Sequence, residues 1–152
     1  MRYIVILVLL LPLLAACSGK GSGKAGTGLK ADTAARVVGI DLGSGYSLDT
    51  ATATYYYRAA KLAVADTATF SVLADGYAAD DSTGYYQGRP FRAEYAHTLS
   101  ALGGGYAKDK FSAYYRGREI ATAQASTFEY VAGDTARDQL DLYVNGVKQY
   151  SN

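Results

Sequence analysis

The 152-residue sequence contains one cysteine, one histidine and two prolines. A single cysteine excludes an intrachain disulfide, and one cysteine with one histidine excludes a zinc site built from several Cys and His ligands. Gly21–Gly26 matches the G-x-G-x-x-G pattern of nucleotide-binding loops, but no strand pattern precedes it and no helix pattern follows it. We therefore expect neither a metal nor another cofactor.

An excess of basic residues is also missing from most of the chain. Arg2, Lys20, Lys24 and Lys30 all precede the first acidic residue, Asp32. From residue 31 onward, 11 Lys and Arg (15 minus those four) face 14 Asp and Glu, a net charge of −3. Because binding to a phosphate backbone needs a cationic surface, we expect no nucleic-acid partner.

The sequence has no apolar run of the length that spans a bilayer. The longest run, Tyr3–Ala16, has 14 residues, and a spanning helix needs roughly 20. It follows the positive start Met1-Arg2, as in a secretory signal peptide. Residues 14–17, Leu-Ala-Ala-Cys, resemble the bacterial lipobox. This resemblance implies that residues 1–16 are a lipoprotein signal peptide and that Cys17 is lipidated, with acylation of the new N-terminus.

The resemblance also indicates a location. Acyl chains on Cys17 would hold the protein to the membrane of a bacterial cell envelope, since two or more chains anchor a protein stably. Ser18 follows the cysteine. In bacteria with two membranes this resembles outer-membrane sorting, facing either the periplasm or the cell surface. Residues 17–30 are rich in Gly, Ser and Lys, which is typical of a flexible linker.

Tyrosine, in contrast, is abundant: the chain has 15 Tyr, a composition that favours β structure. Several of these tyrosines recur at intervals of 29 residues, as do aspartates and Thr-Phe or Thr-Leu pairs. The recurring tyrosines are Tyr56, Tyr85, Tyr114 and Tyr143, and the recurring aspartates are Asp80, Asp109 and Asp138. A fixed period of 20–50 residues is the signature of repeat architecture. The repeats run over about 45–75, 76–104, 105–133 and 134–152, and the last is truncated.

Each repeat predicts three short strands and the turns between them. The second and third strands are joined by two-residue turns, Arg58-Ala59, Gln87-Gly88, Arg116-Gly117 and Asn145-Gly146, of which Asn-Gly is the strongest hairpin signal. We therefore predict an all-β domain over residues 31–152, in which 29-residue β-hairpin repeats stack as a solenoid-like or propeller-like array.

The hairpin register sorts the side chains between two faces. Around Arg116-Gly117, Tyr114 lies opposite Glu119 and Tyr115 opposite Arg118, so that Tyr115 and Ile120 share one face. We predict that this face packs in the core. The other face carries Tyr56, Tyr85, Tyr114 and Tyr143, which we expect to be half-exposed. Tyrosine combines a flat apolar ring with a polar tip, so these four rings are candidate binding residues, with a role in sealing adjacent repeats as the alternative.

The pattern Asp109-Lys110 with Tyr114-Tyr115, Gly117 and Ile120 resembles the DKNYY family of bacterial repeat proteins. The segment Thr69-Phe70-Ser71-Val72-Leu73 is similar to the closing segment of that family. The resemblance covers residues 45–150. It implies a β-rich repeat module and no established activity.

The sequence gives little support for catalytic or metal-binding activity. The repeated aspartates are candidates for calcium binding or for a hydrolase, but one carboxylate per turn more often caps backbone N–H groups. His97 lies in a predicted turn and we interpret it as a surface residue. No catalytic residues are assigned. We expect a non-catalytic binding or structural module of the cell envelope with a protein or glycan partner, and a hydrolase using the repeated aspartates is the alternative.

Overall fold

The computed structural model describes residues 39–150, all of which belong to one compact unit. The signal peptide, Cys17, the linker and the start of the predicted domain at residue 31 lie outside these residues. Among the described residues, no helix is long and apolar enough to cross a membrane.

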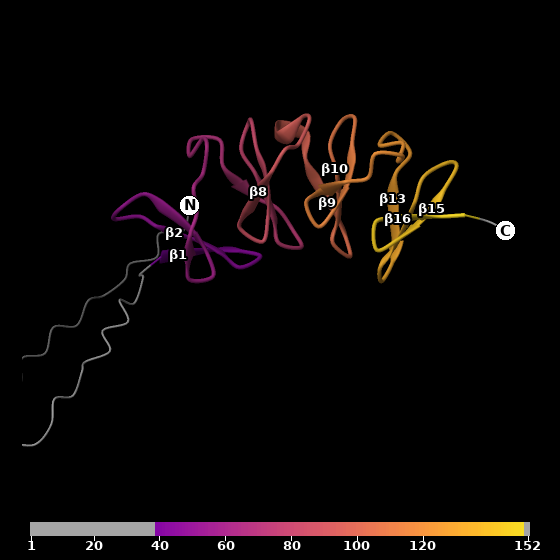
Figure 1. The fold of residues 1–152 in the computed structure, drawn as a ribbon. Coiled ribbons are helices and arrows are strands. Elements are labelled where there is room, and N and C mark those ends of the chain that lie inside the picture. Colours follow the sequence, from indigo (N-terminus) through magenta and orange to yellow (C-terminus); the bar gives the residue numbers. More distant parts are fainter. Residues whose placement is uncertain (1–38, 151–152) are drawn as a thin grey trace, which may run out of the picture. The chain divides into compact units, whose positions relative to one another are not determined.

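Sixteen strands form four sheets, each of four antiparallel strands in chain order (Figure 1). Sheet A consists of β1 (Gly39–Gly43), β2 (Tyr46–Asp49), β3 (Thr54–Tyr57) and β4 (Ala60–Lys61). Sheet B consists of β5 (Ser71–Val72), β6 (Tyr77–Ala79), β7 (Gly84–Tyr86) and β8 (Arg89–Phe91). Sheet C consists of β9 (Ser100–Gly103), β10 (Tyr106–Lys108), β11 (Ala113–Tyr115) and β12 (Arg118–Glu119). Sheet D consists of β13 (Glu129–Ala132), β14 (Thr135–Arg137), β15 (Leu142–Val144) and β16 (Val147–Gln149). The prediction of an all-β domain is confirmed.

The predicted hairpin registers are also confirmed. Tyr114 pairs with Glu119 and Tyr115 with Arg118 across β11 and β12. The corresponding partners of Tyr56, Tyr85 and Tyr143 are Lys61, Pro90 and Lys148. In three of the four turns both central residues have positive φ, as type I′ geometry requires, for example 52° at Asn145 and 75° at Gly146. Sequence turn chemistry therefore fixes the strand pairing.

In sheets B, C and D, the first strand comes from the end of the preceding sequence repeat. Ser71–Val72, in the closing segment of the first repeat, forms β5 and pairs with β6 of sheet B. The same holds for β9 and β13. For this reason the fourth repeat, which lacks a closing segment of its own, still forms a complete four-stranded sheet.

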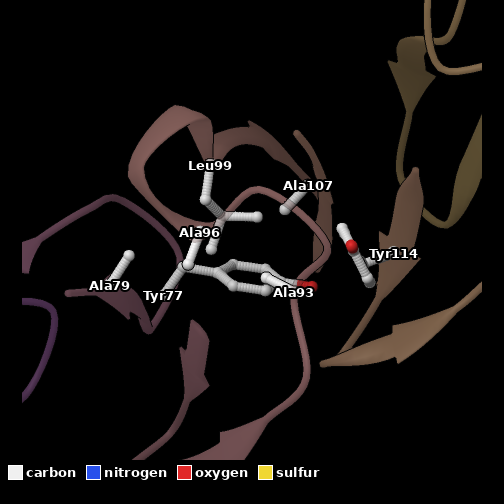
Figure 2. Close-up of a cluster of buried hydrophobic side chains, with 7 residues drawn as sticks. All are labelled: Tyr77, Ala79, Ala93, Ala96, Leu99, Ala107 and Tyr114. Atoms are coloured by element: carbon white, nitrogen blue, oxygen red, sulfur yellow. The ribbon is translucent and has the colours of Figure 1, made fainter. Parts of the chain in front are cut away.

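The core consists of three clusters, each drawing side chains from two consecutive sheets. Tyr46 of sheet A lies with Ala78 and Tyr85 of sheet B. Tyr77 of sheet B lies with Ala107 and Tyr114 of sheet C, and in Figure 2 the ring of Tyr77 points toward Tyr114. A third cluster joins sheets C and D. Both faces of sheets B and C are therefore covered.

This arrangement corrects one prediction. Tyr85, Tyr114 and Tyr143 were expected to be half-exposed, but their exposed fractions are 1%, 1% and 0%. The hairpin rule places Tyr114 on the face opposite Tyr115 and Ile120, and it places Tyr85 and Tyr143 on the equivalent faces of their sheets. Each of these faces packs against the preceding sheet and against the connector, which is the segment that joins the two sheets. Tyr56, in sheet A, is half-buried as predicted. The other face is in the core as well: Leu62 and Ile120 are buried, and Tyr57, Tyr86, Phe91 and Tyr115 are half-buried.

Candidate functional site

The two-residue turns of the four sheets line one groove with a volume of about 930 Å³. We call it the turn groove. It is lined by the turns themselves and by the strand residues on either side of them, and each sheet contributes to it. Its volume lies at the upper end of the range of about 300–1,000 Å³ that is typical of ligand pockets.

Glycines bring the turns of consecutive sheets together. Gly146 has a φ of +75°, and a methyl group on it would lie 2.5 Å from Cβ of Tyr115 in the preceding sheet. A methyl group on Gly88 would lie 2.6 Å from Cβ of Tyr57. Each of these turns therefore rests directly against the second tyrosine of the hairpin before it, and the groove passes from one sheet to the next.

A second set of tyrosines, Tyr46, Tyr77 and Tyr106, forms hydrogen bonds to the same turns. The hydroxyl of Tyr77 in sheet B donates to the carbonyl of Gly105 (2.8 Å) and accepts from the N–H of Gly117 (3.2 Å), both in sheet C. Tyr46 makes the equivalent bonds to sheet B, and Tyr106 to sheet D. Burial raises the pKa of Tyr46 to about 12. Each of these hydroxyls therefore bonds two backbone groups of the next sheet, one of them in a turn that lines the groove.

The groove is cationic. Its lining includes four exposed arginines, Arg58, Arg89, Arg116 and Arg118. Among the described residues that line it, Glu119 is the one carboxylate, so the lining carries a net charge of +3 (four minus one). Glu119 accepts a hydrogen bond from Ser112 at 3.1 Å.

The groove arginines have no carboxylate partner within the described residues. There the ion pairs are Arg137 with Glu129 and Lys148 with Asp141, neither of which involves a groove arginine. Guanidinium groups form bidentate bonds to carboxylates and phosphates. Four such groups left free on one groove are available to an anionic partner.

Three half-buried tyrosines, Tyr57, Tyr86 and Tyr115, lie beside the arginines. The guanidinium of Arg58 lies 5.4 Å from the ring centre of Tyr57, and that of Arg116 lies 5.0 Å from the ring centre of Tyr115. Burial raises the pKa of Tyr86, and the positive charge of Arg116 in the next sheet opposes this rise. Arginine and aromatic groups are thus interleaved along the groove.

The repeated aspartates act as turn caps, as predicted. Oδ1 of Asp109 accepts hydrogen bonds from the N–H groups of Phe111 and Ser112, and Oδ2 accepts from the N–H of Tyr95 and the hydroxyl of Tyr114. Burial raises the pKa of Asp109, but these hydrogen bonds outweigh it and hold the pKa below its usual range. A carboxylate with four donors is not placed to ligate calcium or to exchange protons.

Asp80 and Asp138 are held in the same way, each by the two backbone N–H groups of its own turn, a tyrosine hydroxyl and the N–H of a connector residue. His97 is exposed in a short 3-10 turn, Ala96–Thr98. No group of three or more His, Cys, Asp or Glu side chains that would hold a metal ion occurs in residues 39–150.

The four tyrosines that the sequence suggested as binding residues do not line the turn groove. The rings of Tyr85, Tyr114 and Tyr143 are inside the protein, and their hydroxyls bind Asp80, Asp109 and Asp138. Sequence reasoning missed the groove because its arginines are not all at equivalent repeat positions: Arg58 and Arg116 open their turns, whereas Arg89 and Arg118 follow theirs. The available signal was the recurrence of arginine within two residues of a two-residue turn.

The chain was compared with protein-family models, curated proteins and solved structures, and none of the three comparisons gave a match.

Proposed function

We propose that the protein is a non-catalytic binding module of a bacterial cell envelope and that the turn groove binds its partner. The observation that carries this proposal is the set of four exposed arginines on one groove that have no carboxylate partner among residues 39–150. An unpaired surface charge costs little in water, but four on a concave surface produce a positive potential that attracts anionic partners. The domain as a whole has no such excess, since residues from 31 onward carry a net charge of −3.

The architecture we propose is a tandem array of four hairpin repeats, of solenoid-like or propeller-like form. Three core clusters between consecutive sheets and the repeated hydroxyl bonds of Tyr46, Tyr77 and Tyr106 support it. Small repeats of this kind cannot bury a core alone and are stabilised by their neighbours. The resemblance to DKNYY-family repeats is in line with this architecture.

The location we propose comes from the N-terminal sequence. The apolar run ending in Leu14-Ala15-Ala16-Cys17 resembles a lipoprotein signal, so Cys17 would carry the acyl chains and residues 17–30 would tether the domain to the membrane. A Cys17→Ala variant is expected to lose incorporation of a labelled fatty acid and to keep its signal peptide. Normal labelling of this variant would refute the anchor.

The binding proposal is tested by capture of envelope components on the full chain in detergent micelles. A double variant, Arg89→Gln with Arg118→Gln, is expected to lose the captured partner because both guanidinium groups lie in the groove. A matched control, Lys61→Gln with Arg92→Gln, removes the same charge from exposed residues outside the groove. Equal capture by both double variants, at the wild-type level, would contradict the proposal.

A further inference from the structure

The turn groove presents the same two groups side by side in two of its turns. One is an arginine free to bind an anion, and the other is an aromatic ring next to it. Arg58 with Tyr57 and Arg116 with Tyr115 are such pairs, with guanidinium-to-ring distances of 5.4 and 5.0 Å. A ligand that suits them carries charge at intervals and an apolar flat surface between the charges.

The groove extends over all four sheets, since Tyr57 belongs to sheet A and Val147 to sheet D. Its tyrosines, Tyr57, Tyr86 and Tyr115, recur in successive sheets, whereas its arginines do not all occupy equivalent positions. An occupant that fills a groove spanning four sheets is long, and a polymer of similar rings meets equivalent tyrosines in successive sheets. Gln87 occupies the first position of a turn that lacks an arginine, and its amide suits hydroxyl groups. The amide of Asn145, at the equivalent position of sheet D, is bound to Tyr115 and Asp134.

A peptide strand fits this groove poorly. Extended peptides bind by adding a strand to an exposed sheet edge, through a row of backbone hydrogen bonds. The edge strands that line the groove are β8, β12 and β16. Strand β8 contains Pro90, which has no N–H group, β12 has two residues, and β16 lines the groove with Val147 alone. Side chains rather than backbone are what the groove offers.

A sugar polymer fits better. Sugar rings have apolar C–H faces that pack on tyrosine rings, and their hydroxyls bind amides and phenols. Carboxylates on those rings form the bidentate bonds that arginine prefers. On these grounds, and resting on the proposed function of the groove, we propose that its ligand is a linear acidic glycan, a chain of sugar rings that carry carboxylate groups.

Three polymers separate this proposal from its alternatives: polygalacturonate, which has both rings and carboxylates, dextran, which has rings without charge, and polyglutamate, which has carboxylates without rings. Binding to the full chain in detergent micelles is measured by titration calorimetry. We expect polygalacturonate to bind at least about tenfold more tightly than either control polymer. The variant Arg89→Gln with Arg118→Gln should weaken this binding by at least about tenfold, because glutamine cannot make the charge-assisted bidentate bonds that arginine forms with a carboxylate. Added salt should weaken it further.

The control variant Lys61→Gln with Arg92→Gln should bind polygalacturonate like the wild type. Equal affinity for polyglutamate and polygalacturonate would overturn the glycan assignment, and so would polygalacturonate binding that the groove variant leaves unchanged. Absence of polygalacturonate binding, with arginine-dependent capture of an envelope component retained, would overturn the glycan assignment alone. If that capture were also independent of the groove arginines, the proposed function would fail as well.

Discussion

The hydroxyl of Tyr114 donates a 2.8 Å hydrogen bond to Oδ2 of Asp109, five residues earlier in the same hairpin. The same oxygen accepts the N–H of Tyr95 and the hydroxyl accepts the N–H of Glu94, so the pair binds the connector that precedes sheet C. Tyr85 with Asp80 and Tyr143 with Asp138 repeat the pair in sheets B and D. One buried unit of two side chains thus closes a turn and attaches the sheet to its connector.

The first prediction concerns Asp80 and its neighbour Asp81. Asp80 is 2% exposed and caps its turn, whereas Asp81 is exposed and its side chain makes no hydrogen bond in the described structure. Replacing Asp80 with Ala leaves several buried donors without an acceptor, so we expect a loss of about 3 kcal/mol or more in the free energy of unfolding. Asp81→Ala should change it by less than about 0.5 kcal/mol. Urea unfolding followed by circular dichroism measures both, and similar losses would contradict the capping role.

The second prediction is the response to acid. Burial raises the pKa values of Asp80, Asp109 and Asp138, but the hydrogen bonds they accept outweigh it and lower those pKa values below the ordinary 3.8. A lowered folded-state pKa gives stability that is present above the unfolded-state pKa and is lost as the pH falls through the folded-state pKa. We therefore expect the free energy of unfolding to fall below about pH 4. In Asp109→Asn this fall should be smaller, because one of the three groups no longer titrates. An unchanged acid profile in this variant would count against the assignment.

The third prediction is the response to alkali, which has the opposite sign. Burial raises the pKa values of Tyr46, Tyr114 and Tyr143 to about 12, above the ordinary 10.0. The stability that goes with a raised pKa is fully present below about pH 10 and is lost as the pH rises toward 12. Titration by tyrosinate absorbance should separate an early class of exposed tyrosines from a late class that ionises as the protein unfolds. Tyr114→Phe should remove one member of the late class. A single transition near pH 10 would show that these rings are not buried.

The sequence predicts much of this fold because the relevant signals are local. Two-residue turns set the register of Tyr114 against Glu119, and an aspartate forms its own cap by accepting from the N–H groups two and three residues later. Burial of Tyr114 is not a local property. A hairpin read alone has one core face and one outer face, but sheets B and C are covered on both faces, so the expected half-exposed ring is inside. The turn groove escaped prediction for the same reason, since its arginines meet only when consecutive turns pack together.

The fourth prediction tests that packing with two glycines in the same conformation. Gly133 and Gly146 have φ values of +59° and +75°, but a methyl group on Gly133 meets nothing within 4 Å, whereas one on Gly146 would lie 2.5 Å from Cβ of Tyr115. Replacement by Ala strains the backbone at both, by roughly 1–2 kcal/mol. At Gly146 the clash between sheets adds about 1–3 kcal/mol. Equal losses for Gly133→Ala and Gly146→Ala in thermal unfolding would argue against close contact between the turns of sheets C and D.

The fifth prediction concerns complementary side chains at equivalent core positions. The core between sheets C and D has Ala113, Ile120 and Phe128, and the one between sheets B and C has Gly84, Phe91 and Leu99. Each core has one phenylalanine and one aliphatic side chain at these positions, in exchanged places. Gly84 makes room for the exchange, because a methyl group on it would lie 2.5 Å from Cζ of Phe91.

If the two sets of residues are interchangeable, each single substitution should destabilise the protein, and the three substitutions together should not. Phe91→Ile alone leaves a void and should cost about 1–2 kcal/mol, and Leu99→Phe or Gly84→Ala alone crowds the core and should cost about 1–3 kcal/mol. The triple variant Gly84→Ala with Phe91→Ile and Leu99→Phe gives the core between sheets B and C the residues of the core between sheets C and D. Its free energy of unfolding should lie within about 1 kcal/mol of the wild-type value. Such non-additivity is expected for residues that share one packed volume. Urea unfolding of the three single variants and the triple variant measures it. If the loss of the triple variant equals the sum of the three single losses in the free energy of unfolding, the two cores are not equivalent. The repeats would then share their hairpin register but not their core packing.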